Sequence, residues 1–354
     1  MFYNNNLGLK NITYKKYNLT SFANGINPNI DEQLLPLTTA VTTYNLNFNN
    51  GALKTGMGVK PLSISYSFEN KNLKKTLNKI SGVDFLGMWE YSRWNSAMNR
   101  FEKYLLAYGN DGYMYQAYLY FDYTNFIKLT ALHFDSMPNV VSYYLNGLDV
   151  ALISTNTNGM WVWSPEKTPY KVSNAPKITS MCLHYERLFA TISGDNRTIW
   201  FSDDLDPTNW NVSLSEGGFI SLYDERGGAN KIVSFKDHLY VFREFGISRI
   251  TAYANQENFC VAHLFTSSER VYDKTIVICG NNILFLANDG IYSFDGSSTI
   301  KLNLKLEKLL KNIKNENAVG AYFNGKYYLA LKLNYGDDRI INCESEDDYV
   351  NNAM

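Results

Sequence analysis

The feature that most restricts the fold of this chain is a two-strand unit that recurs about every 40 to 50 residues. In each unit a polar turn precedes a strand-like run, and a polar or glycine-containing turn leads into a second strand. Repeats of this length are typical of β-propeller blades. The members are "EKYLLAYGNDGYMYQA", "LDVALISTNTNGMWVWS", "ERLFATISGDNRTIWFS", "DHLYVFREFGISRITAY", "NNILFLANDGIYSFDG" and "NGKYYLALKLNYGDDRI".

Turn chemistry supports the same interpretation. Asn-Gly and Asn-Asp-Gly supply the positive φ values of tight hairpins, and the flanking Leu, Ile, Val, Tyr and Phe residues fill a pleated sheet. One sheet cannot bury both faces, whereas sheets arranged radially cover one another. The first strands are marked by Leu105, Val150, Leu188, Leu239, Leu284 and Tyr328, and the hairpin turns by Gly112, Gly159, Gly246 and Gly290.

These patterns predict an all-β fold, a β-propeller of about six blades. The alternative, a β-sandwich or two stacked sheets, uses the same hairpins. Helical periodicity is limited to 302–315 and, more weakly, to 68–80.

Composition excludes several classes of function. The chain has 354 residues, 45% hydrophobic and 19% charged, with a formal net charge of -1. Such a chain folds, and it has no overall basic charge for nucleic acid or anionic membranes. No run approaches the roughly 18 apolar residues of a membrane span. The four cysteines form no CxxC pair, so we expect free thiols and no cofactor.

The stretch "IWFSDDLDPTNWN" crowds three aspartates between two tryptophans. We expect a metal-independent structural turn formed by Ser202, Asp204, Pro207 and Trp210, because Asp and Ser side chains bond nearby backbone N–H groups and proline fixes a turn. Trp210 then packs on its own blade. The alternative is a calcium site at Asp203, Asp204 and Asp206, although their spacing is not that of an EF-hand.

Signals of catalysis are missing from the sequence, which contains no GxSxG, HExxH or GxxxxGK[ST] motif. The stretch has a loose likeness to the Asp-box of sialidase propellers, but a sialidase needs clustered arginines, and no local pattern gathers Arg187, Arg197, Arg243, Arg249 and Arg270. We therefore expect no enzyme. In "FREFGISRI" we expect a cross-strand ion pair among Arg243, Glu244 and Arg249.

Several segments together resemble a family of β-propeller structural proteins from the neck or tail of tailed bacteriophages, including packaged-DNA stabilisation and tail-nozzle-like components. They are "FANGINPNIDEQLLPLTTAVTTYNLNFNNGALKTGMGVKPL", "ERLFATISGDNRTIWFSDDLDPTNW", "IVSFKDHLYVFREFGISRITAY" and "ILFLANDGIYSFDG". The resemblance extends from residue 21 to about residue 333 and carries no catalytic residues. It implies a virion structural component, made in the bacterial cytoplasm, that assembles with its own copies and with neighbouring neck or tail proteins. The alternative is a propeller that binds host glycan or cell wall.

The domain organisation that follows is an N-terminal arm over 1–62 and a propeller over 63–354. The chain ends soon after the first hairpin of the sixth unit, where a blade needs one or two more strands. Either an N-terminal strand completes this blade or the chain is shortened. We expect part of the arm to add a strand beside "KYYLALKL" and the remainder to reach a neighbouring subunit.

Overall fold

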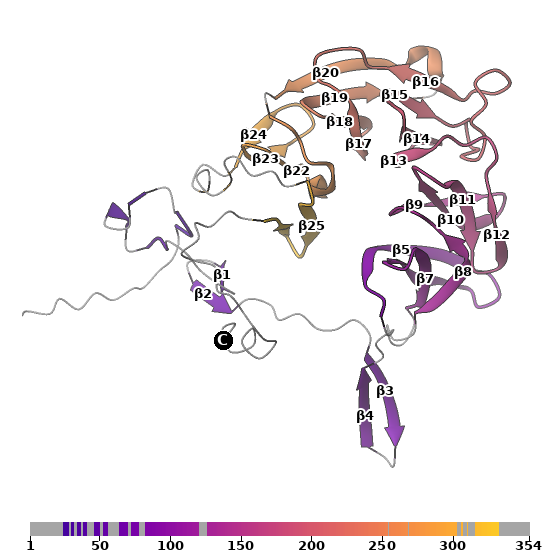
Figure 1. Ribbon diagram of the computed structural model, residues 1–354, viewed down its shortest axis with the longest axis horizontal. Helices are drawn as coiled ribbons and strands as arrows, with labels where there is room; N and C mark the ends of the chain where they lie inside the picture. Colours follow the sequence, from indigo (N-terminus) through magenta and orange to yellow (C-terminus); the bar gives the residue numbers. More distant parts are fainter. Residues whose placement is uncertain are drawn as a thin grey trace, which may run out of the picture. The chain divides into compact units, whose positions relative to one another are not determined.

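The computed structural model describes most of the region from 82 to 332, with gaps at 120–125, 254, 268, 303–305, 307–309 and 311–315 (Figure 1). It also describes 24–27, 30–31, 34–36 and 38–40, and the backbone of four short strands between 46 and 77. The chain forms two compact units. One contains the hairpin of β1 (Leu46–Asn49) and β2 (Ala52–Thr55), and the other contains all later strands.

The larger unit contains five four-stranded antiparallel sheets in chain order. The first three are β5 (Phe85–Asn95), β6 (Arg100–Gly109), β7 (Tyr113–Tyr118) and β8 (Ile127–His133); β9 (Asn139–Leu145), β10 (Leu148–Thr155), β11 (Gly159–Ser164) and β12 (Lys167–Lys171); and β13 (Ile178–His184), β14 (Arg187–Ile192), β15 (Asp195–Phe201) and β16 (Gly218–Ser221).

The fourth sheet contains β17 (Ala229–Phe235), β18 (His238–Arg243), β19 (Gly246–Thr251) and β20 (Cys260–Thr266). The fifth contains β21 (Val277–Cys279), β22 (Asn282–Ala287), β23 (Gly290–Phe294) and β24 (Thr299–Lys301). A last pair, β25 (Val319–Phe323) and β26 (Lys326–Ala330), follows. Two short 3-10 helices are Gln256–Asn258 and Asp273–Thr275.

Successive sheets pack on one another as propeller blades do. The first strands β5, β9, β13 and β17 lie toward the middle, and the fourth strands lie outside (Figure 1). Each major hydrophobic cluster combines residues of two adjacent sheets, as when Phe242 of β18 meets Phe285 of β22. The prediction of an all-β propeller is confirmed. The number of blades stays a prediction, because the last sheet has two strands in the described region.

The predicted anchors lie on equivalent strands, but not on the first ones. Each lies on the second strand of its sheet, because a further strand precedes every predicted hairpin. Val150, Leu188 and Leu239 are buried, whereas Leu105 and Leu284 are half-buried.

Two of the predicted turn glycines are required for different physical reasons. Gly159 has φ +80°, a conformation that an L-residue with a side chain rarely adopts. At Gly246 the reason is space, since a Cβ atom there would overlap with the Phe265 carbonyl oxygen of the neighbouring strand. The sequence located both turns without distinguishing these causes.

The helix predicted over 68–80 is wrong. The backbone forms an antiparallel hairpin of β3 (Ile64–Glu69) and β4 (Asn72–Leu77), with Phe68 opposite Leu73 and Ile64 opposite Leu77. Leu73 and Leu77 are four residues apart, a spacing that places them on one face of either a helix or a strand. The helix predicted over 302–315 falls largely outside the described residues.

The strand expected in the arm pairs within the arm itself. β1 covers Leu46–Asn49 and forms its hydrogen bonds with β2. Residues 1–23 and 333–354 lie outside the described region, so completion of the last sheet by the arm stays a prediction. Within the region that the structure describes, no helix is long and apolar enough to cross a bilayer.

The topology places the turns at two ends of the propeller. End 1 carries the turns between the first and second strands of each sheet and between the third and fourth strands. End 2 carries the turns between the second and third strands and the connections from one sheet to the next. Contacts across end 1 agree with this, since Lys236 Nζ in one sheet donates to the Asp295 carbonyl oxygen of the next at 2.7 Å.

Candidate functional site

The aspartate stretch lies at end 1, between β15 and β16, and is held by its own hydrogen bonds. Asp203 accepts from the backbone N–H of Asp204 at 2.8 Å and from the Asn209 amide at 2.9 Å. Asp206 accepts from the N–H and the hydroxyl of Thr208 at 2.9 and 2.6 Å. The acceptor side chains are therefore Asp203 and Asp206, whereas Asp204, the predicted turn residue, contributes its backbone N–H.

Ser202 and Trp210 attach this turn to the propeller. The Ser202 hydroxyl accepts from the Leu188 N–H at 3.0 Å. The Trp210 indole N–H donates to the Pro207 carbonyl at 3.0 Å, and its ring is buried in a cluster that includes Met160 and Val162 of the second sheet as well as Leu188 of the third. Trp210 therefore packs between its own sheet and the preceding one, whereas the sequence predicted contact with its own blade.

The alternative interpretation, a calcium site at Asp203, Asp204 and Asp206, requires a cluster of metal ligands. In the part of the chain that the structure describes, no three His, Cys, Asp or Glu side chains gather as metal ligands would. Calcium sites need six or more converging oxygens. The geometry here is that of a hydrogen-bonded turn.

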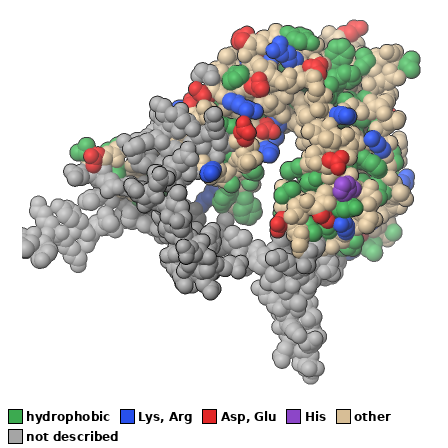
Figure 2. Space-filling model, viewed as in Figure 1, with side chains coloured by type: hydrophobic (Ala, Val, Ile, Leu, Met, Phe, Trp, Pro, Cys, Tyr) green, Lys and Arg blue, Asp and Glu red, His purple; other side chains and the backbone are tan. Residues whose placement is uncertain are grey.

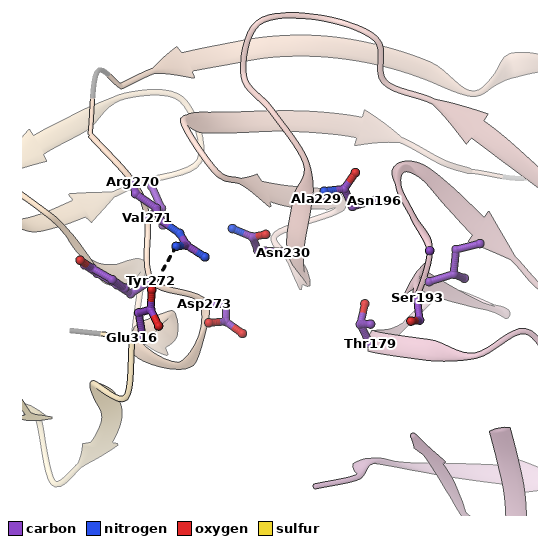
Figure 3. Close-up of a pocket in the computed structure, with 12 residues that line it drawn as sticks. Thr179, Ser193, Asn196, Ala229, Asn230, Arg270, Val271, Tyr272, Asp273 and Glu316 are labelled. Atoms are coloured by element: carbon purple, nitrogen blue, oxygen red, sulfur yellow. Dashed lines mark ion pairs between the residues drawn. The ribbon is translucent and has the colours of Figure 1, made fainter. Parts of the chain in front are cut away.

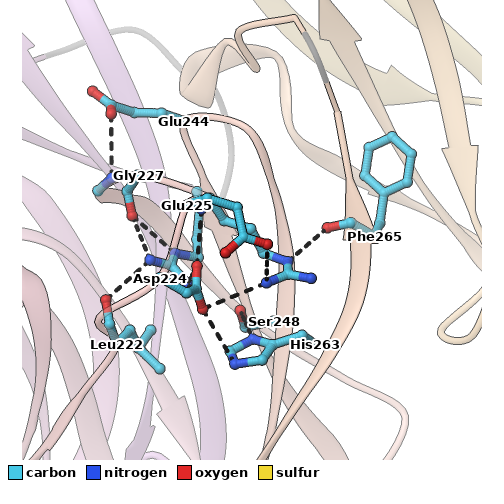
Figure 4. A network of polar contacts seen from close by, with 11 residues as sticks. Leu222, Asp224, Glu225, Gly227, Glu244, Ser248, His263 and Phe265 are labelled. Carbon is cyan, nitrogen blue, oxygen red and sulfur yellow. Dashed lines mark hydrogen bonds and ion pairs between the residues drawn. The ribbon is translucent and has the colours of Figure 1, made fainter.

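A buried ionic network joins the loop after β16 to the end of β18 (Figure 4). The Arg243 guanidinium is 0% exposed and donates from Nη1 to both carboxylate oxygens of Asp224 at 2.7 Å. It also donates to the carbonyls of Leu222 and Gly227. Burial raises the pKa of Asp224, but hydrogen bonds from the Arg226 N–H and from Arg243 outweigh burial and hold this pKa below its usual range.

This network corrects the ion pair predicted in "FREFGISRI". Arg243 pairs with Asp224, and Glu244 accepts a hydrogen bond from the Gly228 N–H at 3.2 Å. No local pattern could have found Asp224, because it reaches Arg243 through a loop 19 residues away in sequence.

Asp224, His263 and Ser248 are linked in a row by polar contacts and are the residue types of a hydrolase triad. His263 Nε2 lies 3.2 Å from Asp224, and its Nδ1 lies 3.0 Å from the Ser248 hydroxyl. A nucleophile must reach its substrate, whereas Ser248 is completely buried. The arrangement orients His263 against the sheet and offers no accessible nucleophile.

His184, at the end of β13, is a buried and neutral histidine. Its Nδ1 lies 2.8 Å from the Ser234 hydroxyl. Burial, together with the nearby charge of His238, lowers its pKa from 6.5 to about 4.

We predict that this histidine makes stability depend on pH. Its folded-state pKa is lower than its unfolded value, so the unfolded chain binds the proton more tightly. The free energy of unfolding should fall by roughly 2–3 kcal/mol as the pH drops from about 6.5 to about 4. Urea unfolding at a series of pH values measures this. His184→Gln should flatten the dependence of the free energy of unfolding on pH, whereas substitution of the exposed His133 by Gln should not. If the native protein and His184→Gln lost stability equally with falling pH, the prediction would be wrong.

End 2 carries a polar pocket of about 440 Å³ between the third, fourth and fifth sheets (Figure 3). Arg270 and Glu316 form an ion pair at one side, and Thr179 and Ser193 lie at the other, with Asn230 and Asp273 between them. No local pattern in the sequence indicated this pocket, since its residues come from five separate segments. Of the five arginines weighed for a sialidase-like cluster, Arg270 alone lines this pocket.

End 1, in contrast, exposes large apolar side chains from several sheets. The rings of Trp94 and Phe101 contact each other at 4.9 Å between centroids, and those of Tyr185 and Tyr253 at 5.2 Å. Phe101 is 68% exposed and Tyr253 64%. Further exposed side chains at this end are Met98, Tyr144, Leu205, Leu214 and Phe323.

Comparisons with known proteins identify no family for this chain. No protein-family model matches the chain, and no curated protein matches it in sequence. Among solved structures it is similar to PorZ, a surface component of the type-IX secretion system of Porphyromonas gingivalis, at 13% identity and a TM-score of 0.43, over 77% of this chain and 36% of PorZ. It is also similar to Hsv2 of Kluyveromyces lactis at 9% identity and a TM-score of 0.45, over 81% of this chain and 90% of that one.

A third similar structure is BBS1N in complex with ARL6DN, at 8% identity and a TM-score of 0.41, over 70% of this chain and 74% of that one. The chain thus spans about a third of PorZ and most of the other two. At these identities the similarity does not bear on function.

Proposed function

We propose that this protein is a non-enzymatic structural component of a tailed-bacteriophage virion, in the tail or the head-to-tail connector region. The phage assignment rests on the sequence resemblance of the arm and of the "WFSDDLDPTNW" turn. The assembly role is supported by one structural observation, the apolar surface of end 1. Soluble monomers rarely expose large apolar patches, and aromatic and methionine side chains are enriched where proteins bind each other.

The partner at end 1, in this proposal, is another copy of the chain. An apolar surface is complementary to itself, as a two-fold interface between identical subunits requires. The face shown in Figure 2 carries hydrophobic side chains interspersed with both signs of charge. Neighbouring neck or tail proteins would bind the remaining surfaces.

We predict that purified protein forms discrete dimers, visible as paired particles by electron microscopy and measurable by light scattering. Replacing Phe101 and Tyr253 together by serine should weaken self-association at least about tenfold, because central aromatic residues contribute about 2 kcal/mol or more each. The matched control is Tyr223→Ser at end 2, where the side chain is 70% exposed. Monomeric particles at all concentrations would contradict the proposal. So would an equal loss of self-association in the Phe101 and Tyr253 double variant and in Tyr223→Ser.

The alternative function, recognition of host glycan or cell wall, is favoured by a different feature, the polar pocket at end 2. A glycan-binding propeller needs a concave site with convergent polar groups. This pocket meets that requirement independently of end 1.

A further inference from the structure

The pocket at end 2 lies where three sheets begin. Thr179 is near the start of β13, Asn230 is near the start of β17, and Asp273 begins the 3-10 helix that precedes β21. The hairpin turn between β14 and β15 closes one side with Ser193. Its volume of about 440 Å³ lies within the range of about 300 to 1,000 Å³ that small-molecule sites occupy.

The backbone around the pocket is already hydrogen-bonded. The Thr179 carbonyl accepts from the Asn139 amide at 2.9 Å. The Ser180 hydroxyl accepts from the Ile232 N–H at 3.3 Å, and Lys231 Nζ donates to the Asp273 and Ile276 carbonyls. An added peptide strand needs free backbone groups along a sheet edge. These bonds disfavour strand addition and leave recognition to side chains.

Several side chains in the pocket remain available to a ligand. Asn230, Ser193 and Asp273 make no side-chain hydrogen bond to any other residue in the described part of the chain. The Arg270–Glu316 pair spans 3.5 Å, and both side chains are more than half exposed. Exposed pairs of this kind are weak, so their hydrogen-bonding atoms are accessible too.

The charge and polarity of this lining restrict the ligand class. Two carboxylates face one guanidinium, which disfavours an anionic ligand. Amide, carboxylate and guanidinium groups each present paired planar donors or acceptors, which suit two adjacent hydroxyl groups. Ile192 adds a small apolar surface that the C–H face of a sugar ring can contact.

We propose that this pocket binds a neutral saccharide unit, with Asn230 and Asp273 as its principal hydrogen-bonding residues. This site rests on the alternative function proposed above, for which it names the ligand class, and it is independent of the assembly role, because end 1 and end 2 share none of the residues involved. A protein of this kind would recognise sugar hydroxyls at one end and associate through the other.

Saturation-transfer difference NMR of the full chain tests this with glucose, galactose, mannose and N-acetylglucosamine as probes, and with inorganic phosphate and a short oligolysine peptide as comparisons. At least one sugar should receive saturation and titrate to a plateau. Asn230→Ala and Asp273→Ala should each weaken its binding about tenfold, as the loss of a hydrogen bond to a charged or buried group does. Circular dichroism verifies that both variants fold.

The matched control is Glu186→Ala, which removes an exposed carboxylate at end 1 and should leave sugar binding unchanged. Failure of all four sugars to bind would overturn the proposal. So would sugar binding that survives both pocket substitutions. Binding of oligolysine alone, lost in Asp273→Ala, would instead assign the pocket to a basic side chain of a protein partner and would also overturn it.

Discussion

Arg243→Ala should lower the free energy of unfolding by about 3–5 kcal/mol, the usual cost of removing one partner from a buried ion pair. The guanidinium is fully buried, and its loss removes the hydrogen bonds that it donates to the Asp224 carboxylate and to the carbonyls of Leu222 and Gly227. Urea denaturation followed by circular dichroism or fluorescence measures the change.

Two further substitutions make this prediction specific. Arg243→Lys keeps the charge but cannot reproduce the forked contact, so its effect should lie between those of the native protein and Arg243→Ala. Arg197→Ala removes an exposed arginine and should change stability by no more than about 0.5 kcal/mol. If Arg243→Ala were as mild as Arg197→Ala, the network would not stabilise the propeller.

Trp210→Ala should also cost about 3–5 kcal/mol, because a large aromatic side chain leaves a cavity that the surrounding core fills only in part. The indole is 3% exposed and belongs to a hydrophobic cluster formed by residues of two sheets. Calorimetry or urea unfolding of the variant measures this loss. Leu214→Ala, in the same connection but 87% exposed, is the control and should have little effect.

A double-mutant cycle decides whether Trp210 joins the second and third sheets. Met160 lies on β11 of the second sheet and belongs to the same cluster. If the two side chains share contacts, the effects of Trp210→Ala and Met160→Ala should deviate from additivity by at least about 0.5 kcal/mol. Strict additivity would mean that Trp210 stabilises its own sheet alone, as its sequence position suggests.

The repeat of hairpins predicted the fold class correctly because strand alternation and turn chemistry act over a few residues. Asn146 and Gly147 have φ values of 49° and 82°, the positive pair that an Asn-Gly hairpin requires. The same local signals were ambiguous at Leu73 and Leu77, where a spacing of four suits both a helix and a strand. Local reasoning also missed the first strand of each sheet, since strands such as β9 lack a hairpin turn before them.

The sequence by itself determined the all-β architecture, the tight turns and the self-bonded character of the aspartate stretch. Only the tertiary structure decided that Asp203 and Asp206 are its acceptors, that Trp210 packs between two sheets, that Arg243 pairs with Asp224, and that the pocket at end 2 exists. The reason is the range of the interactions. Backbone conformation is set by neighbours a few residues apart, whereas the partner of a buried side chain depends on which loop the stacking of sheets brings next to it.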